Sequence, residues 1–365
     1  MNITWLENNV DTLRLPIHLD NDTDYIKEIT ERYDKILSAF SGTEAIELTK
    51  FTEQIIASVK AYYNSDTIES YDLVFQLMKE LSTDSNAELC FSTFEKTKIP
   101  KNKSKHSQLF RAREGEPYIE YSADKMGYVP FEQRSKCAAN RYSLAGIPCL
   151  YLGNTSYVCW LEMNCPSDDR FCVSPYTIDD SLSFFNIALP IEQLYSLLNE
   201  DNIDRERFMF LMKIYLLEIA TSVHIKQRNR QFNSEYIISQ NIMRACKRLK
   251  VDGIIFYTTR ASDNLMSSVC GYNIALYIDY QEDTNSSSIF DSSTKHGDSV
   301  NYAMFKNLLP SANLVKYDLA IYNTGDIPNI GSMKNQISYI ETQFHLFDNY
   351  VFSHWHEGPL DISRE

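Results

Sequence analysis

Apolar side chains recur every three or four residues through the first quarter of the chain, which is the spacing of one helix face. Three such faces follow one another: Ile26, Ile29, Tyr33, Ile36, Leu37 and Phe40, then Leu48, Phe51, Ile55, Val59 and Tyr62, then Tyr71, Val74, Phe75, Met78 and Leu81. Breaks at Gly42-Thr43 and Ser65-Asp66 separate them, as helix boundaries do. Residues 1–95 are therefore predicted to form a small helical bundle, either an oligomerisation unit or a regulatory domain that senses a partner.

Shorter apolar runs bounded by turns follow after residue 105, which is the pattern of strands mixed with helices. The predicted strands cover 109–113, 147–152, 184–189, 251–257 and 272–280, and the predicted helices cover 205–225 and the stretch from Ser234 to Leu249. Two more strand-like runs, Leu314–Tyr322 and Ile337–Phe344, lie near the end of the chain. The fold class expected is α+β, with the helical bundle preceding a core of mixed strands and helices.

Changes in composition divide the chain further. Residues 96–105 are basic and polar without interleaved aromatics, which favours a solvated linker over a nucleic-acid patch. Residues 283–299 are rich in Ser, Asp and Thr and are predicted to be a mobile loop. The expected organisation is a helical domain at 1–95, the linker, a core at 106–282, the loop, and a C-terminal segment at 300–365 that packs on the core.

The overall charge and the cysteines narrow the possible classes of protein. The 365 residues carry a net charge of −14, which argues against a general nucleic-acid binder because phosphate attraction must come from Lys and Arg. None of the eight cysteines forms a C-x-x-C pair, which disfavours zinc and suits free thiols in a reducing cytoplasm. Neither a long apolar span nor a signal-peptide pattern is evident, so we expect a cytoplasmic protein without membrane segments.

Familiar cofactor motifs are missing from the sequence. Neither a GxGxxG nor a Walker-type glycine loop occurs, which disfavours dinucleotide-dependent dehydrogenases and P-loop enzymes. His354-x-His356 with His345 offers imidazoles on one predicted strand face, but no third ligand has an evident spacing. No metal is therefore expected, and packing around Trp355 is the preferred interpretation.

The stretch from Arg141 to Glu162 carries the strongest candidate chemistry. A Gly-x-Pro turn follows Arg141, and an apolar run then predicts a short strand that contains Tyr151. A polar cap opens a helix that ends at Glu162. Alone, the three would be an ordinary loop cation, a half-buried tyrosine and a helix-surface carboxylate. Together they bring a cation, an aromatic ring and a carboxylate to one neighbourhood.

This stretch resembles the RES domain family, whose pattern has an Arg before a Gly-x-Pro-type turn, a Tyr ending a strand and a Glu ending a helix, as Arg141, Tyr151 and Glu162 do here. A second block also matches: Glu235-Tyr236, Gln240, Asp252-Gly253-Ile254, Tyr257-Thr258-Thr259-Arg260 and Gly271-Tyr272-Asn273. The sequence departs from the family at Thr258, where the family has a serine. The resemblance covers about residues 106–280 and implies an ADP-ribosyltransferase-like core with NAD as substrate.

Each candidate residue has a role that its chemistry supports. A carboxylate such as Glu162 can stabilise the oxocarbenium-like ribose that forms when nicotinamide leaves, and can accept a proton from the incoming nucleophile. The planar guanidinium of Arg141 suits a diphosphate, and Tyr151 offers a flat face to nicotinamide. The remaining NAD contacts are expected from Arg111, Thr258 and Asn273.

Three functional hypotheses follow from the resemblance. The first is a toxin that consumes NAD by cleaving its nicotinamide–ribose bond and arrests growth, in a toxin–antitoxin pair or in anti-phage defence, with an antitoxin or regulator bound by the N-terminal domain. The second is ADP-ribosyl transfer to a protein acceptor from the same site. The third is an NAD-binding module without turnover, which only Thr258 favours. The sequence leaves open whether the acceptor is water, phosphate or a macromolecule, and whether the chain forms homo-oligomers.

Overall fold

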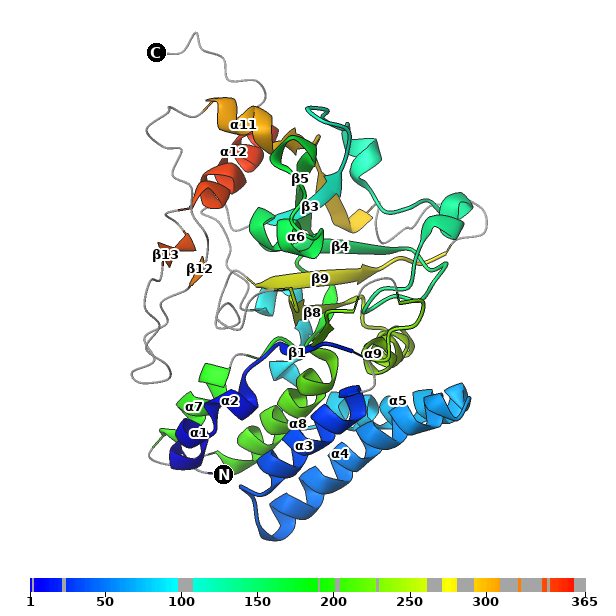
Figure 1. The fold of residues 1–365 in the computed structure, drawn as a ribbon, viewed down its shortest axis with the longest axis vertical. Coiled ribbons are helices and arrows are strands. Elements are labelled where there is room, and N and C mark those ends of the chain that lie inside the picture. The colour runs from blue at the N-terminus through cyan, green and yellow to red at the C-terminus, as the bar shows by residue number, and fades with distance from the viewer. Residues whose placement is uncertain are drawn as a thin grey trace.

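The computed structural model describes the chain except residues 2, 22–23, 98–107, 190, 201–203, 228–229, 261–270, 281–291, 309–320, 323–336, 340–341 and 358–365. Its helices are α1 (Ile3–Asn8), α2 (Val10–Leu13), α3 (Tyr25–Leu37), α4 (Gly42–Tyr63), α5 (Thr67–Thr83), α6 (Ser156–Glu162), α7 (Ile191–Leu198), α8 (Arg205–Thr221), α9 (Tyr236–Arg248), α11 (Tyr302–Leu308) and α12 (Gln343–Glu357). Its strands are β1 (Ile17–Leu19), β2 (Phe91–Thr93), β3 (Leu109–Glu114), β4 (Cys149–Gly153), β5 (Phe171–Ile178), β6 (Ser183–Asn186), β7 (Val223–Ile225), β8 (Gly253–Tyr257), β9 (Tyr272–Tyr277), β10 (Thr294–His296), β11 (Val300–Asn301), β12 (Ile321–Tyr322) and β13 (Ile337–Ser338). The fold is a mixed α+β arrangement, with the N-terminal helical layer at one end, the sheet in the middle, and α11 and α12 at the other end (Figure 1).

The three amphipathic helices predicted near the N-terminus are confirmed as α3, α4 and α5. Each buries the apolar face that its spacing defined, with Ile29 and Ile36 of α3 and Ile55 of α4 fully inside. The start of α5 is fixed by Asp66, whose carboxylate accepts the backbone N–H of Glu69 at 2.8 Å. That bond satisfies one of the amide donors that the first turn of a helix leaves unpaired.

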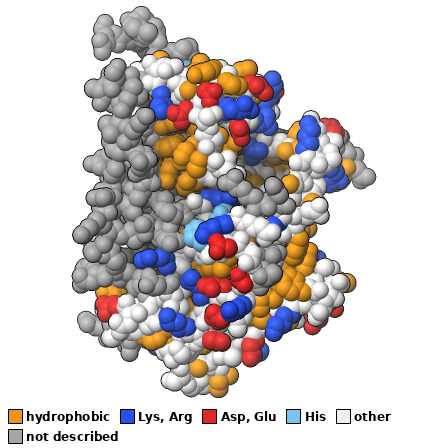
Figure 2. Space-filling view, in the orientation of Figure 1, with side chains coloured by type: hydrophobic (Ala, Val, Ile, Leu, Met, Phe, Trp, Pro, Cys, Tyr) orange, Lys and Arg blue, Asp and Glu red, His pale blue; other side chains and the backbone are white. Residues whose placement is uncertain are grey.

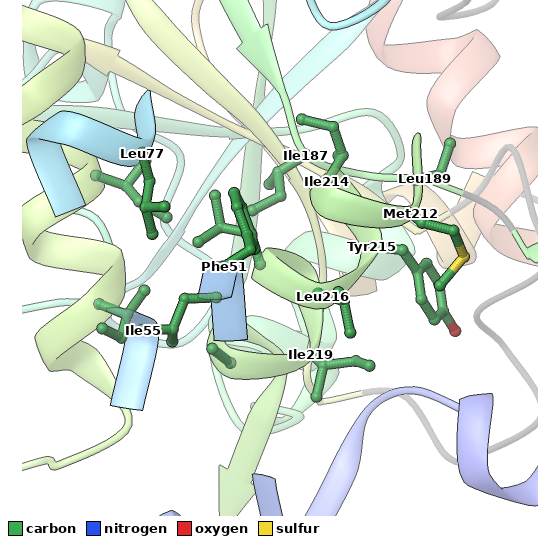
Figure 3. Packing of buried hydrophobic residues seen from close by; sticks show 14 of the residues in the cluster. Phe51, Ile55, Leu77, Ile187, Leu189, Met212, Ile214, Tyr215, Leu216 and Ile219 are labelled. Carbon is green, nitrogen blue, oxygen red and sulfur yellow. The ribbon is translucent and has the colours of Figure 1, made fainter. Parts of the chain in front are cut away.

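Helices α8 and α9 are the elements against which the N-terminal helices pack, since α3 and α4 contact α8 and α5 contacts α9. Every residue of α8 from Phe208 to Thr221 is buried, so this helix is covered on all sides. Figure 3 shows Phe51 and Ile55 lying beside α8, and the apolar side chains of α3, α4, α5, α8 and α9 form one cluster. The hydroxyl of Tyr33 also donates to the Leu216 carbonyl at 2.7 Å.

The apolar faces of residues 1–95 are thus covered from within the chain. We expected them to bury against a partner or a second copy, or else to pack on the core, and the structure shows the latter. The physical reason is that α8 carries apolar side chains on most of its circumference, while its Lys213 pairs with Glu47 and Glu80 of the N-terminal helices, so the helix needs cover on that side. Most of the predicted linker, residues 98–107, lies outside the described residues, so the domain boundaries at 95 and 106 stay predictions.

The predicted helix 205–225 ends four residues early, at Thr221. Val223–Ile225 instead form β7, which pairs in parallel with β1, so that His224 lies beside His18. The backbone N–H of Ile17 donates to the Ser222 carbonyl at 2.8 Å, and that of Lys226 donates to the Leu19 carbonyl at 2.8 Å. Strand pairing with the N-terminal segment therefore overrides the helical spacing of these residues.

The main sheet places β4 between β3 and β9, and the order within the described residues is β10-β5-β3-β4-β9-β8-β6-β2. The pairs are antiparallel except β6 with β8, which is parallel. In the register of β4 and β9, Tyr151 lies opposite Ala275 and Gly153 lies opposite Asn273. This register brings the ends of the two strands, and the side chains that they carry, to one edge of the fold.

The C-terminal part differs from its prediction. Residues 343–357 form α12, so the strand predicted for Ile337–Phe344 is wrong beyond the short β13, and His345 and His354 lie on a helix. Within the predicted loop 283–299, Thr294–His296 form β10 on the edge of β5. Helices α11 and α12 cover the sheet through an aromatic cluster that includes Tyr302, Phe344 and Phe347. Helix α12 contacts α6, which follows β4.

Candidate active site

A cavity of about 890 Å³ lies where β4, β9, α6, α9 and β7 meet. Its volume is in the upper part of the range found for sites that enclose small molecules, roughly 300–1,000 Å³. Four of the six residues that the sequence nominated line it: Arg141, Tyr151, Glu162 and Asn273. They come from a turn, two strands and a helix, and the fold brings them to one space.

Arg141 is a nearly buried cation, with 7% of its surface exposed. Its Nη2 donates to the Tyr257 carbonyl at 2.8 Å, and its guanidinium carbon lies 4.5 Å from the centre of the Phe256 ring. Among the described residues no carboxylate forms an ion pair with it, and its Nε has no hydrogen-bond partner. Burying a charge without an opposite charge is costly, so this arginine is a strong candidate for binding an anionic ligand.

The turn that carries Arg141 is held from two sides. The side-chain amide of Gln240 on α9 donates to the carbonyls of Asn140 and Ser143, at 3.1 and 3.3 Å. The hydroxyl of Tyr151 donates to the Ser143 hydroxyl oxygen at 2.9 Å. Burial raises the pKa of Tyr151 well above its ordinary value, so the phenol stays a neutral donor at physiological pH. Gln240 therefore positions the turn, which is a role that the sequence match did not specify.

Glu162 is oriented by Asn273, whose Nδ2 donates to the Glu162 Oε1 at 2.7 Å. Asn273 is only 6% exposed, so its amide is held in place by the fold around it. The route from β4 into α6 is tight at Gly153, where an added Cβ would lie 2.8 Å from the Cys159 Sγ and 3.1 Å from the Thr155 carbonyl oxygen. Glycine at this position lets the helix fold back close to the strand that carries Tyr151.

The first turn of α6 is capped by two residues, one local and one distant. The Thr155 hydroxyl oxygen accepts the Val158 N–H at 3.2 Å, as the sequence predicted for a cap at this point. The second cap is Asp348 of α12, whose carboxylate accepts the Ser156 N–H at 3.0 Å and the Tyr339 hydroxyl at 2.5 Å. The helix that ends in Glu162 is thus held at its start by the C-terminal part of the chain.

The Asp348 carboxyl is buried, with 4% of the residue exposed. Burial raises the pKa of this carboxyl to about 7. The hydrogen bonds from Ser156 and Tyr339 lower the pKa, but by less than burial raises it. The nearby groups on the other packed elements are the Cys159 thiol of α6 and the Tyr302 phenol of α11, and the Asp348 charge contributes to raising the pKa of both. The Asp348 carboxyl, at the start of the helix that carries Glu162, therefore changes charge close to neutral pH.

Arg111 and Thr258 lie outside the lining of the cavity. Arg111 alternates along β3 with Ala112, which does line it, so the two side chains project to opposite faces of the strand. Burial lowers the pKa of Arg111 from its ordinary value. The Thr258 hydroxyl oxygen accepts the Arg260 N–H at 3.1 Å and so shapes the turn that presents Thr259 and Arg260 to the cavity. The direct NAD contacts predicted for Arg111 and Thr258 stay predictions.

Another side of the cavity is formed by β7 and the residues that follow it. The sequence patterns did not predict this side. It consists of Val223, His224, Ile225, Lys226, Gln227 and Arg230, which we call the β7 wall. Arg230 forms a two-bond ion pair with Glu235, at 2.9 and 2.5 Å, and both side chains are almost fully buried. The pairing of β1 with β7 joins segments that are far apart in the sequence, so no local pattern signals this wall.

The electrostatics of the cavity combine both signs of charge. Burial raises the pKa of Tyr236, the neighbouring Glu235 and Glu162 raise it further, and Arg141 and Arg260 lower it. Its phenol therefore lies among two carboxylates and two guanidinium groups. The pKa of His224 is lowered to about 4, first by burial and then by nearby cations, of which Arg260 contributes most. At neutral pH this imidazole is uncharged.

The described part of the chain offers no recognisable metal site. Among those residues, no three or more His, Cys, Asp or Glu side chains gather in a way that could hold an ion. Within the same residues, none of the helices combines the length and apolar character needed to cross a membrane.

Comparison with curated proteins finds a similarity to the protein named "Putative toxin YopC" from Bacillus subtilis (strain 168). The two are 24% identical over 296 residues, a match that covers 78% of this chain and 65% of the length of that relative. No protein-family model matches the chain. The resemblance to the RES family, and the fold and substrate that it implies, therefore stay predictions.

Among solved structures, the chain is similar to a chain in the crystal structure of the M. tuberculosis MbcT–MbcA toxin–antitoxin complex. The superposition has a TM-score of 0.28 and 10% sequence identity, and it covers 56% of this chain and 88% of that one. A TM-score at this level is too low to carry an argument about fold or function.

Proposed function

We propose that this protein is a toxin that consumes NAD by cleaving the bond between nicotinamide and ribose. The observation that carries the proposal is one cavity that combines a buried guanidinium lacking a carboxylate partner among the described residues, Arg141, with a carboxylate oriented by a buried amide, Glu162. The proposed toxicity rests on the sequence similarity to the protein named as a toxin.

The chemistry assigned to the cavity follows from the charges that the reaction creates. Cleavage breaks the C1′–N bond, nicotinamide leaves as a neutral pyridine, and positive charge develops on the ribose. The Glu162 carboxylate stabilises that charge, while an incoming hydroxyl or water forms the new bond to C1′ and passes its proton to the carboxylate. Asn273 keeps the carboxylate in position without neutralising it, since an amide donates a hydrogen bond but carries no charge.

The other residues of the cavity bind the rest of the dinucleotide in this proposal. Arg141 binds a phosphate with the donors that the protein leaves available, and the Tyr151 and Tyr236 rings offer flat faces for stacking. The acceptor of the ADP-ribosyl group is left to experiment. An antitoxin that binds and silences the protein belongs to the same proposal.

The proposal is tested by incubating purified protein with NAD and following free nicotinamide and ADP-ribose. Glu162→Gln retains the oxygen that accepts from Asn273 but removes the charge, so we expect nicotinamide release to fall by about 10²-fold or more with folding intact. Glu116→Gln, at an exposed position outside the cavity, is the matched control. Near wild-type release by the Glu162→Gln protein would refute the assignment, and growth arrest on expression should disappear with the same variant.

A further inference from the structure

The β7 wall has no assigned role in the proposed reaction, yet it faces the same cavity as Glu162. Lys226 and Arg230 belong to it, and Arg260 extends into the cavity from the turn after β8. Figure 2 shows Lys or Arg and His side chains together with Asp or Glu side chains near the middle of the visible face. The net charge of the chain is −14, so three basic side chains around one cavity have the sign opposite to that of the protein as a whole.

The charges of the β7 wall and of the neighbouring Arg260 do not cancel. Glu235 lines the cavity but is bound at both oxygens by Arg230, so that pair is internally neutral. Lys226 pairs with Asp20 at 3.1 Å, but these side chains are 62% and 84% exposed, and an ion pair this exposed is weak and readily exchanged. Two cations, Lys226 and Arg260, thus remain to attract a ligand.

Arg260 is the cation best placed to bind directly. Its Nη1 donates to the Asn164 side-chain oxygen at 2.9 Å, which fixes one edge of the guanidinium. An arginine has five N–H donors, so this bond leaves most of the planar fork available. Its main-chain N–H is held by Thr258, so both ends of the residue are oriented.

His224 adds a neutral hydrogen-bonding group to this wall, because burial first and the nearby cations second lower the pKa of its imidazole. Half-buried among Arg260, Arg230 and Lys226, its imidazole has a pKa lowered to about 4, so it adds no charge at neutral pH. It can offer hydrogen bonds to a sugar hydroxyl or a phosphate oxygen. The β1 pairing and its two backbone hydrogen bonds hold this side chain in the wall.

We propose that Arg260, on the turn after β8, and Lys226 of the β7 wall complete a diphosphate subsite together with Arg141, so that these cations hold the two phosphates of a dinucleotide. This inference rests on the proposed function for the identity of the ligand. It adds that the segment Ile17–Asp20, through β1 and Asp20, supports the wall that holds the anionic part of the substrate.

The test measures binding of ADP-ribose, inorganic pyrophosphate and nicotinamide by calorimetry, without turnover. Arg260→Gln keeps an amide donor for Asn164 and removes the charge. We expect about tenfold weaker binding of ADP-ribose and pyrophosphate, at the low end for a charged hydrogen bond because the residue is exposed, with nicotinamide unaffected. Arg260→Lys should recover part of the affinity, and rising salt should weaken wild-type binding more steeply than that of the Gln variant.

The matched control is Arg113→Gln, which removes an exposed arginine from β3 outside the cavity lining and should change neither affinity. If Arg260→Gln binds ADP-ribose and pyrophosphate as tightly as wild type does, the subsite is refuted whatever the enzyme does. If the protein fails to cleave NAD, yet Arg260→Gln still loses affinity for both anions, the subsite stands and the proposed reaction is refuted.

Discussion

The two sides of the cavity differ in what holds them. The β7 wall is held from the N-terminal end of the chain by backbone hydrogen bonds between β1 and β7 and by the apolar core around α8. The opposite side depends on α6, which is held from the C-terminal end by Asp348, a buried ionisable group. Backbone amides do not titrate near neutral pH and a buried carboxyl does. Changes in pH near neutrality should therefore disturb the α6 side of the site before the β7 wall, whose His224 changes charge only near pH 4.

The largest effect is expected from removing the N-terminal helices. A protein shortened to begin near Ser104 lacks the cover over α8, so buried side chains such as Phe208, whose ring packs on Phe40, meet water. We expect aggregation rather than a soluble core, measured by light scattering and by loss of a cooperative thermal transition. A shorter deletion, of residues 1–20, keeps α3 to α5 and removes β1. It should leave the protein soluble and weaken ADP-ribose binding through the β7 wall.

A soluble, cooperatively folding protein from the longer deletion, with ADP-ribose affinity equal to that of wild type, would contradict this account. It would show that the helical layer is an independent domain and that the β7 wall stands without β1. The two sides of the cavity would then not differ in the way that the N-terminal and C-terminal parts of the chain hold them.

The second largest effect is expected from removing Arg141, which lies on the sheet side of the cavity. Arg141→Ala removes the buried guanidinium and with it charge-assisted hydrogen bonds to a phosphate, so we expect ADP-ribose affinity to fall by about 10- to 100-fold. Arg141→Lys should recover part of this loss, because a lysine keeps the charge but not the planar fork. Calorimetry measures both. Unchanged affinity in the alanine variant would remove Arg141 from the binding site and leave the phosphates to the β7 wall.

The smallest effect concerns pH and Asp348. Its carboxyl has an ordinary pKa of 3.8 and a pKa of about 7 in the fold, so between these values the folded state holds a proton that the unfolded state has lost. The free energy of unfolding contributed by this group therefore falls as pH rises from about 4 to about 7, by at most about 1.4 kcal/mol per pH unit. Asp348→Asn imitates the protonated form and should flatten this dependence.

Urea unfolding of both proteins at several pH values measures the difference. Asp72→Asn, which changes an exposed aspartate on α5, is the matched control and should keep the wild-type slope. Parallel curves for wild type and Asp348→Asn would mean that the Asp348 carboxyl does not titrate in this window. The contrast between a titrating and a non-titrating side of the cavity would then be wrong.

Local patterns in the sequence were sufficient wherever the structure depends on neighbours along the chain. The periodic faces of residues 25–83 predicted three helices because each is amphipathic over several turns. Arg141, Tyr151 and Glu162 fall within one turn–strand–helix unit, so their convergence on the cavity follows from a short stretch of sequence. Asn273 reaches Glu162 because the β4–β9 register places it opposite Gly153, and only its place in the second matching block indicated this.

Contacts between distant segments could not be predicted in the same way. Val223 and Ile225 continue the apolar spacing of α8. No local sequence pattern therefore indicates that they leave the helix and pair with a three-residue strand near the N-terminus. The burial of α8 from Phe208 to Thr221 likewise depends on two layers that meet only in the folded chain. The Asp348 cap on α6 joins residues separated by 192 positions, and its sequence context is that of an ordinary helix.

The pairing of β1 with β7 also sets an order of events during synthesis of the chain. The bond from Tyr25 to the Ala220 carbonyl, just before that pairing, already spans 195 residues. At the usual 5–20 residues per second, the first strand waits roughly 10–40 s on the ribosome before its partner has been made. Through that interval the β7 wall does not exist, and the nascent chain carries an incomplete cavity. A cell that makes this protein therefore has a delay, set by translation speed, between the start of synthesis and the completion of the cavity.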